Sequence, residues 1–113
     1  MKPGDVVLIT LPQAAGAPPK PRPALILASL PGPYQNLLLC GISTQRHQLQ
    51  KDWDELLEAG DPDYGNSGVH QPSVIRLSFL YAADGTEISG VIGRVDAARL
   101  ARLCERLADH LSP

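Results

Sequence analysis

Residues 24–43 have the sequence ALILASLPGPYQNLLLCGIS, in which two apolar runs flank a Pro-Gly-Pro turn. The runs 24–29 and 36–43 have the length of strands and are rich in Leu and Ile, which predicts two strands. The short connection between them predicts an antiparallel hairpin. Because neither run alternates apolar with polar residues, we expect both strands to be buried on both faces.

Three further segments extend the β pattern on either side of this hairpin. Residues 5–10 (DVVLIT) and 73–81 (SVIRLSFLY) are rich in β-branched residues, and residues 87–95 (EISGVIGRV) have similar character, so each predicts a strand. The Asp84-Gly85 pair before the last strand is a hairpin turn signal. It predicts that the chain returns there as a hairpin.

Two segments interrupt or follow this pattern. Residues 46–72 are polar and turn-rich, and the piece DWDELLEAG within them fits either a short helix or an edge strand. Residues 96–111 (DAARLARLCERLADHL) predict a helix. Asp96 is a natural N-cap, and Val95 can pack onto Leu100. The helical spacing puts one set of apolar residues on a single stripe: Leu100, Leu103, Cys104, Leu107 and Leu111. The arginines off this stripe are expected to face water: Arg99, Arg102 and Arg106.

The order of these elements favours a mainly β fold with a C-terminal helix. No βαβ repeat is present, so a small antiparallel barrel or sheet closed by the helix is expected. The 113 residues fit one domain, 1–113, and the eleven prolines and ten glycines argue against a helical bundle.

Composition narrows the class of protein further. The net charge of −2 argues against a general basic clamp on nucleic acid, although a local basic groove is still allowed. Cys40 and Cys104 lie in apolar runs and are expected to be buried thiols. Because zinc motifs, a signal segment and a membrane-length apolar stretch are missing from the sequence, we expect no metal, no cofactor, no membrane association and a cytoplasmic location.

The proline-rich segment 11–23 ends at a candidate anion ligand. Five of its thirteen residues are proline, so we expect a long surface loop without a sheet ladder. Arg22 stands between Pro21 and Pro23, and a stiffly held guanidinium suits a phosphate. The alternative is an ordinary exposed arginine.

Polar residues at two strands are further candidates. Ser43-Thr44-Gln45 follows an apolar strand, where hydroxyls can bind phosphate oxygens or simply cap a turn. Arg76 lies within a strand, where it needs a partner or water. Strict alternation puts two sets on opposite faces of that strand: Arg76, Ser78 and Leu80 on one, and Ile75, Leu77 and Phe79 on the other.

Histidines and aromatics leave alternatives open. His47 and His70 bracket the polar segment and are candidates for proton transfer or plain loop residues. His110, near the end of the predicted helix, is taken as structural. The larger aromatic residues could stack on nucleobases or fill the core: Trp53, Tyr64 and Tyr81.

Segments along nearly the whole chain resemble the MazF/PemK family of bacterial toxins. They are PGDVVLITL, KPRPALIL, LLLCGISTQ, QPSVIRLSFLYAADG and ISGVIGRVDAARLARLCERL. The resemblance implies an SH3-like β-barrel that works as a homodimer. It also implies metal-independent, sequence-specific cleavage of single-stranded RNA by the RNA's own 2′-hydroxyl, which leaves 2′,3′-cyclic phosphate and 5′-hydroxyl ends.

The resemblance also assigns roles to single residues. The family's active-site Arg falls on Arg22, its catalytic Thr on Ser43, with Thr44 following, and a second Arg on Arg76. Gln45, Arg46, His47 and Ser78 are then expected to bind RNA.

This sequence departs from the family at three places. Ser43 stands where a Thr is usual, Ser78 where some members have an Asp, and Ala15-Gly16-Ala17 where some have a His. Proton transfer is therefore left to an Arg, to His47 or to His70.

The family's partner and its fold relatives give further expectations. A cognate antitoxin with a disordered acidic tail is implied, and the tail would lie in the RNA groove. The alternative functions are a CcdB-like toxin that binds a protein target such as DNA gyrase, and a catalytically impaired RNA-binding homologue.

Overall fold

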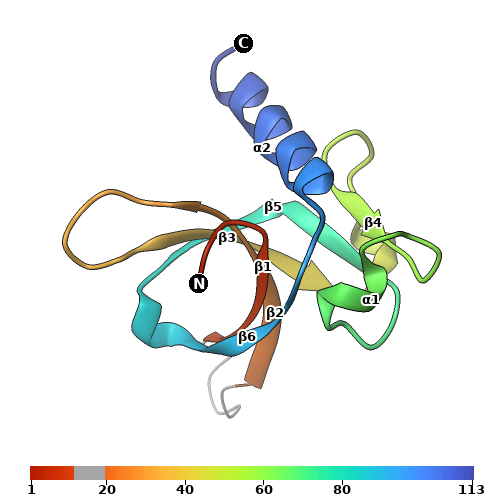
Figure 1. Ribbon diagram of the computed structural model, residues 1–113. Coiled ribbons are helices and arrows are strands. Elements are labelled where there is room, and N and C mark those ends of the chain that lie inside the picture. Colours follow the sequence, from red (N-terminus) through yellow and green to blue (C-terminus); the bar gives the residue numbers. More distant parts are fainter. Residues whose placement is uncertain (12–19) are drawn as a thin grey trace.

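The computed structural model describes residues 1–11 and 20–113, which form one antiparallel sheet and two α-helices (Figure 1). The elements are β1 (Asp5–Leu11), β2 (Lys20–Ser29), β3 (Leu37–Ser43), β4 (Glu55–Leu57), α1 (Tyr64–Ser67), β5 (Ser73–Ala83), β6 (Ile88–Arg94) and α2 (Ala97–Leu111). The strand order is β4-β5-β3-β2-β1-β6. The predicted class, mainly β with a C-terminal helix, is confirmed. Among the helices described, none has the length and apolarity needed to cross a membrane.

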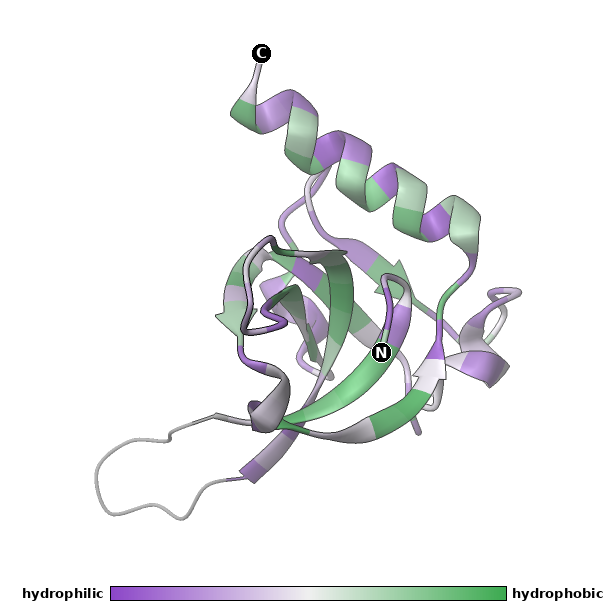
Figure 2. Cartoon of the chain, turned by 60° about the vertical axis from the view of Figure 1, so that its left-hand side comes forward, coloured by the Kyte–Doolittle hydropathy of each residue, from purple (hydrophilic) through white to green (hydrophobic). Residues whose placement is uncertain are grey.

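The β2–β3 hairpin is buried on both faces, as its sequence predicts. Residues 24–27 are all buried, and alternate residues along the hairpin enter two different core clusters. One cluster includes Leu25 and Cys40 and reaches Leu103 on α2. The other includes Ile26 and Leu39. Figure 2 shows the corresponding pattern, with strongly apolar strands and a helix that alternates between apolar and polar residues.

The expectation of a ladder-free loop over residues 11–23 is wrong at both ends. β1 runs to Leu11, and β2 begins at Lys20, so Arg22 pairs with Ile9 and Pro23 with Leu8. The ladder tolerates these prolines because β3 joins β2 only from Ala24 onward, which leaves residues 20–23 with a partner on one side only. Residues 12–19, with the Ala15-Gly16-Ala17 stretch, lie outside the described residues.

Of two further sequence predictions, the hairpin at Asp84-Gly85 is wrong, and the choice between helix and edge strand in DWDELLEAG is decided. The Asp84-Gly85 turn does not form a hairpin, because β5 pairs with β3 and β4 whereas β6 pairs with β1. Instead, Asp84 and Glu87 form a capping box around a short 3₁₀ turn, η2 (Gly85–Glu87). The DWDELLEAG segment contains β4, so its edge-strand alternative is correct.

Backbone contact at two glycines brings α1 against β6. The end strands β4 and β6 do not pair within the described part of the chain, so the sheet is barrel-like but open. A Cβ at Gly93 would lie 2.2 Å from the Asn66 carbonyl oxygen, and one at Gly68 would lie 2.2 Å from that of Ile92. The α1 segment therefore approaches β6 more closely than any side chain would allow.

Arg99 is buried, which contradicts the prediction that it faces water. Its Nε and Nη2 donate to the two carboxylate oxygens of Asp63 at 2.7 and 3.1 Å. Nη1 donates to Glu55 and to the Leu56 carbonyl, and Nη2 also donates to Asp61, each at 3.0 Å. All five N–H groups of the guanidinium therefore have an acceptor.

Asp63 joins this ion-pair cluster to the start of α2. Asp96 is the N-cap residue, as predicted, but its side chain makes no capping hydrogen bond. Its backbone N–H instead donates to Asp63 at 3.1 Å. Burial raises the pKa of Asp63, but hydrogen bonds from Arg99 and from the Asp96 backbone outweigh this effect, so the net pKa lies below its usual value.

We predict that Gly93→Ala destabilises the protein because the new methyl group would collide with the backbone of α1. The free energy of unfolding, measured by urea denaturation, should fall by about 1–3 kcal/mol, as for other overpacked sites. Gly90→Ala is the matched control on the same strand, because a Cβ at Gly90 would have no other atom within 4 Å. Equal stability of the two variants would contradict the close packing of α1 on β6.

Removal of Arg99 should be much more damaging than removal of its neighbour on α2. Arg99→Ala leaves Asp63 buried without its main partner, so the free energy of unfolding at pH 7 should fall by about 3–5 kcal/mol. Arg102→Ala, at a side chain that is 52% exposed, should cost less than about 1 kcal/mol. Because Asp63 has a lowered pKa in the folded state, the Arg99 effect should shrink as the pH falls well below 3.8. A loss that is independent of pH would argue against the ion pair as its cause.

Candidate active site

Strand register places several predicted site residues on one face of the sheet. Arg22 and Ala24 are two residues apart on β2 and share a face. Ala24 pairs with Gly41 of β3, and Gly41 pairs with Arg76 of β5. Directly paired residues lie on the same side of a sheet, so Arg22 and Arg76 project from the same face. Ser43, two residues after Gly41, shares it as well.

A pocket of about 270 Å³ opens on this face. The residues that line it come from β1, β2, β3, β5 and the turn after β3: Ile9, Arg22, Pro23, Gly41, Ile42, Ser43, Thr44, Gln48, Arg76 and Phe79. All four residues predicted as catalytic, Arg22, Ser43, Thr44 and Arg76, therefore line one pocket.

The two arginines of the pocket differ from the arginines of β6 and α2. Arg94, Arg99, Arg102 and Arg106 each form an ion pair with a carboxylate. Arg22 and Arg76 form none within the described residues. The Nε of Arg76 is buried and has no hydrogen-bond partner in this part of the chain. Two uncompensated guanidinium groups make the pocket suited to an anion.

The Ser43 hydroxyl is held in a defined orientation. Its oxygen accepts a hydrogen bond from the Gln45 backbone N–H at 3.1 Å, a turn typical of Ser and Thr. Because this contact uses an oxygen lone pair, the hydroxyl proton remains free to be donated. Thr44 follows at the exposed rim of the pocket. The site thus offers a hydroxyl donor beside two cationic groups.

A bulge in β5 corrects the predicted alternation of that strand. Gly41 pairs with Arg76, but the preceding residue, Cys40, pairs with Leu80, so residues 77–79 form an insertion in the ladder. The insertion reverses the faces after it. Phe79 therefore lies in the pocket instead of on the face of Ile75 and Leu77, and its ring covers Gly41.

Ser78 is used by this bulge and does not line the pocket. Its backbone N–H and hydroxyl donate to the buried Asp54 carboxylate at 3.0 and 3.1 Å. Asp54 also accepts the Gln50 backbone N–H at 2.9 Å. Ser78 therefore lies at the centre of a structural contact between β5 and the segment before β4.

Comparisons with known proteins place the chain in a family. Residues 2–111 match the family model described as PemK-like, MazF-like toxin of type II toxin-antitoxin system. The chain belongs to this toxin family. Among solved structures, the toxin MazF-mt6 of Mycobacterium tuberculosis is similar to it, with a TM-score of 0.68, 20% identity and 95% coverage of both chains. A comparison with curated protein sequences gives no match.

The other residues of this toxin that were predicted to bind RNA, and the histidines predicted as candidates for proton transfer, do not line the pocket. Gln45, Arg46 and His47 are exposed in and beside the 3₁₀ turn η1 (Arg46–Gln48), and none of them lines the pocket. His70 lines a neighbouring cavity that shares Pro23 and Thr44 with the pocket. The pocket lining described contains neither a histidine nor a carboxylate.

The aromatic residues and cysteines of the toxin have mostly structural positions. The side chains considered as alternatives for base stacking pack against the two core clusters: Trp53, Tyr64 and Tyr81. Trp53 also contacts the ring of His110 at 4.9 Å between centroids. Cys40 is a buried free thiol, as predicted, and Cys104 is a half-buried one. Burial raises the pKa of Cys40.

Gln48 and Phe79 are among the lining residues that the sequence did not predict. Gln48 enters the pocket through the turn of η1, which no local motif indicates. Strict alternation assigns Phe79 to the core face, whereas in the structure its side chain is 39% exposed. Only knowledge of the bulge would place it in the pocket.

Proposed function

We propose that this toxin is an endoribonuclease that cleaves single-stranded RNA through the RNA's own 2′-hydroxyl. One observation carries the proposal: Arg22, Ser43 and Arg76, from three different strands, line one pocket, and both arginines lack carboxylate partners among the described residues. This is the arrangement expected for binding a phosphodiester.

The proposed reaction is an internal transfer at phosphorus. The 2′-oxygen forms a bond to phosphorus and loses its proton, while the bond from phosphorus to the 5′-oxygen breaks and that oxygen gains a proton. The products are a 2′,3′-cyclic phosphate and a 5′-hydroxyl. Negative charge builds up on the non-bridging phosphate oxygens during the reaction, and one well-placed donor can supply roughly 3–4 kcal/mol of stabilisation.

The chain's own residues divide this work among them. Arg22 and Arg76 would donate to the non-bridging oxygens, and Arg76 Nε has no competing acceptor in the described chain. Ser43 would donate a hydrogen bond from its hydroxyl to the same phosphate, with Thr44 beside it. Residues 12–19 contain no ionisable side chain, and the described lining has no histidine or carboxylate. We therefore propose that electrostatic stabilisation supplies most of the rate increase and that solvent carries the protons.

Membership of the family implies an antitoxin partner. We propose that an acidic tail of this partner occupies the same pocket, since a carboxylate and a phosphate compete for the same guanidinium groups. Arg46, exposed on η1, would add a third positive charge. A homodimer remains an expectation from the family.

Incubation of the purified toxin with a mixed single-stranded RNA should yield fragments with cyclic-phosphate and 5′-hydroxyl ends, as identified by mass spectrometry. Arg22→Ala and Arg76→Ala should each lower kcat/KM by at least about 100-fold, because each removes a donor to the developing charge. The free energy of unfolding should change by less than about 0.5 kcal/mol for Arg22→Ala, whose side chain is exposed.

Arg102→Ala is the control, because Arg102 on α2 is bound to Glu55 and does not line the pocket. Its cleavage rate should match that of the wild type. Full activity in Arg22→Ala, or products with 5′-phosphate ends, would refute the proposed chemistry.

Affinity for single-stranded RNA should fall as the salt concentration rises. Removing one phosphate contact should reduce the slope of log affinity against log salt by about 0.7. Arg22→Ala should show this reduction and Arg102→Ala should not, as measured by fluorescence anisotropy with an RNA that carries a 2′-deoxy sugar at the cut site. Binding that does not depend on salt would argue against a phosphate-binding pocket.

A further inference from the structure

A second cavity, of about 560 Å³, adjoins the pocket that holds the two arginines. The two share Pro23 and Thr44, so the cavities border each other at these residues. The second cavity lies between β1, β6 and the connection from α1 to β5, and its lining consists of Leu8, Pro23, Thr44, Gly68, Val69, His70, Gln71, Ser73 and Ile92. None of the residues predicted as catalytic enters it except Thr44.

The wall of this cavity is held in place by backbone contacts. Gly68 has a φ of +81°, and a Cβ there would lie 2.2 Å from the Ile92 carbonyl oxygen, so only glycine allows the connection to approach β6 so closely. On the other side of His70, the buried Ser73 hydroxyl donates to the Gln71 carbonyl at 2.9 Å. The segment that carries His70 and Gln71 is thus anchored at both ends.

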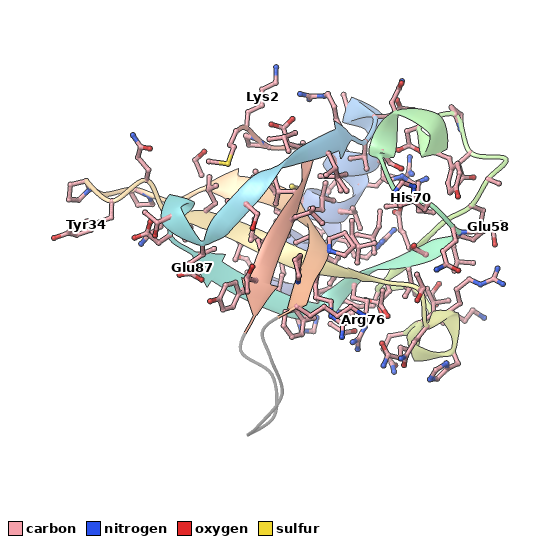
Figure 3. All side chains as sticks on the ribbon, turned by 90° about the horizontal axis from the view of Figure 1, so that it is seen from below. Lys2, Tyr34, Glu58, His70, Arg76 and Glu87 are labelled. Atoms are coloured by element: carbon pink, nitrogen blue, oxygen red, sulfur yellow. The ribbon has the colours of Figure 1, made fainter. Side chains whose placement is uncertain are left out.

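The chemistry of the lining suits a flat, partly polar ring. Leu8, Val69 and Ile92 supply apolar walls, whereas His70 and Gln71 are exposed side chains at the opening. Figure 3 shows His70 near α1, at a distance from the labelled Arg76. An imidazole can stack on a nucleobase, and an amide can exchange two hydrogen bonds with a base edge. The volume is within the range of ordinary ligand sites.

We propose that this cavity holds the base of a nucleotide next to the cleaved phosphate and that His70 and Gln71 discriminate between bases there. The proposal rests on the proposed ribonuclease function, because the position of the occupant follows from a phosphate bound between Arg22 and Arg76. A nucleotide that leaves this phosphate on the side of Thr44 and Pro23, the residues that the two cavities share, would enter the second cavity. The described lining of the cavity carries no carboxylate that would repel the RNA backbone.

The experiment compares wild type, His70→Ala and Gln71→Ala by sequencing the 5′ ends of fragments from a random single-stranded RNA. Base preference at one position beside the cut should weaken by about tenfold in each variant, which corresponds to removal of one good base contact. kcat/KM at the preferred sites should fall by about the same factor, because each variant loses a favourable contact to the base. His110→Ala is the matched control, because His110 lies on α2, packs against Trp53 and lines neither cavity.

A second measurement separates this inference from the proposed function. Binding of RNAs with a 2′-deoxy sugar at the cut site, varied at single bases, reports base preference without cleavage. If the wild type cleaves RNA but both variants keep its base preferences, the base site is refuted and the ribonuclease function stands. If the wild type cuts no RNA but binds it with a base preference that both variants lose, the base site stands and the ribonuclease function is refuted. Absence of both binding and cleavage would overturn both, and a change spread over several positions would also refute a single base site.

Discussion

The fold of this toxin depends on one buried guanidinium, that of Arg99 on α2. Its five N–H groups bind Asp63, Glu55, Asp61 and the Leu56 carbonyl, so a single side chain holds β4 and the segment before α1 against the C-terminal helix. No single member of this cluster can be removed without cost, because its absence would leave a buried charge unsatisfied. The same segment then carries α1 to its backbone contact with β6, where Gly68 and Gly93 permit the approach.

Asp54 connects the ion-pair cluster around Arg99 to the candidate active site. Asp54 precedes the Arg99 partner Glu55, and it binds Ser78 in the bulge of β5. The bulge lies directly after Arg76 and puts Phe79 over Gly41 in the pocket. The contacts that order the α2 side of the sheet therefore also set the shape of the opposite face.

The charged side chains are distributed unevenly over the fold. The chain has a net charge of −2, but its carboxylates neutralise the arginines of β6 and α2, and Arg22 and Arg76 are left without acidic partners in the described residues. A protein can thus be acidic as a whole and still offer a cationic pocket, because the local field is set by the groups nearest to it. The adjoining apolar cavity adds a surface of different chemistry beside the cationic one, as a site for a nucleotide would require.

Local sequence determined the strands of the β2–β3 hairpin, the C-terminal helix, and the positions of Arg22, Ser43, Thr44 and Arg76 at the ends of strands or within one; the resemblance to the toxin family assigned these four residues to a common site. These features follow from apolar runs and from motifs of adjacent residues, which act over a few positions along the chain. Tertiary structure decided the burial of Arg99, the pairing of β6 with β1, the position of Phe79 and the second cavity beside Thr44. Each depends on a partner far away in the sequence: Asp63 is 36 residues from Arg99, and Asp54 is 24 residues from Ser78. The pattern around a residue indicates which face of an element it occupies, but only the folded chain brings in the distant group that changes that face or neutralises its charge.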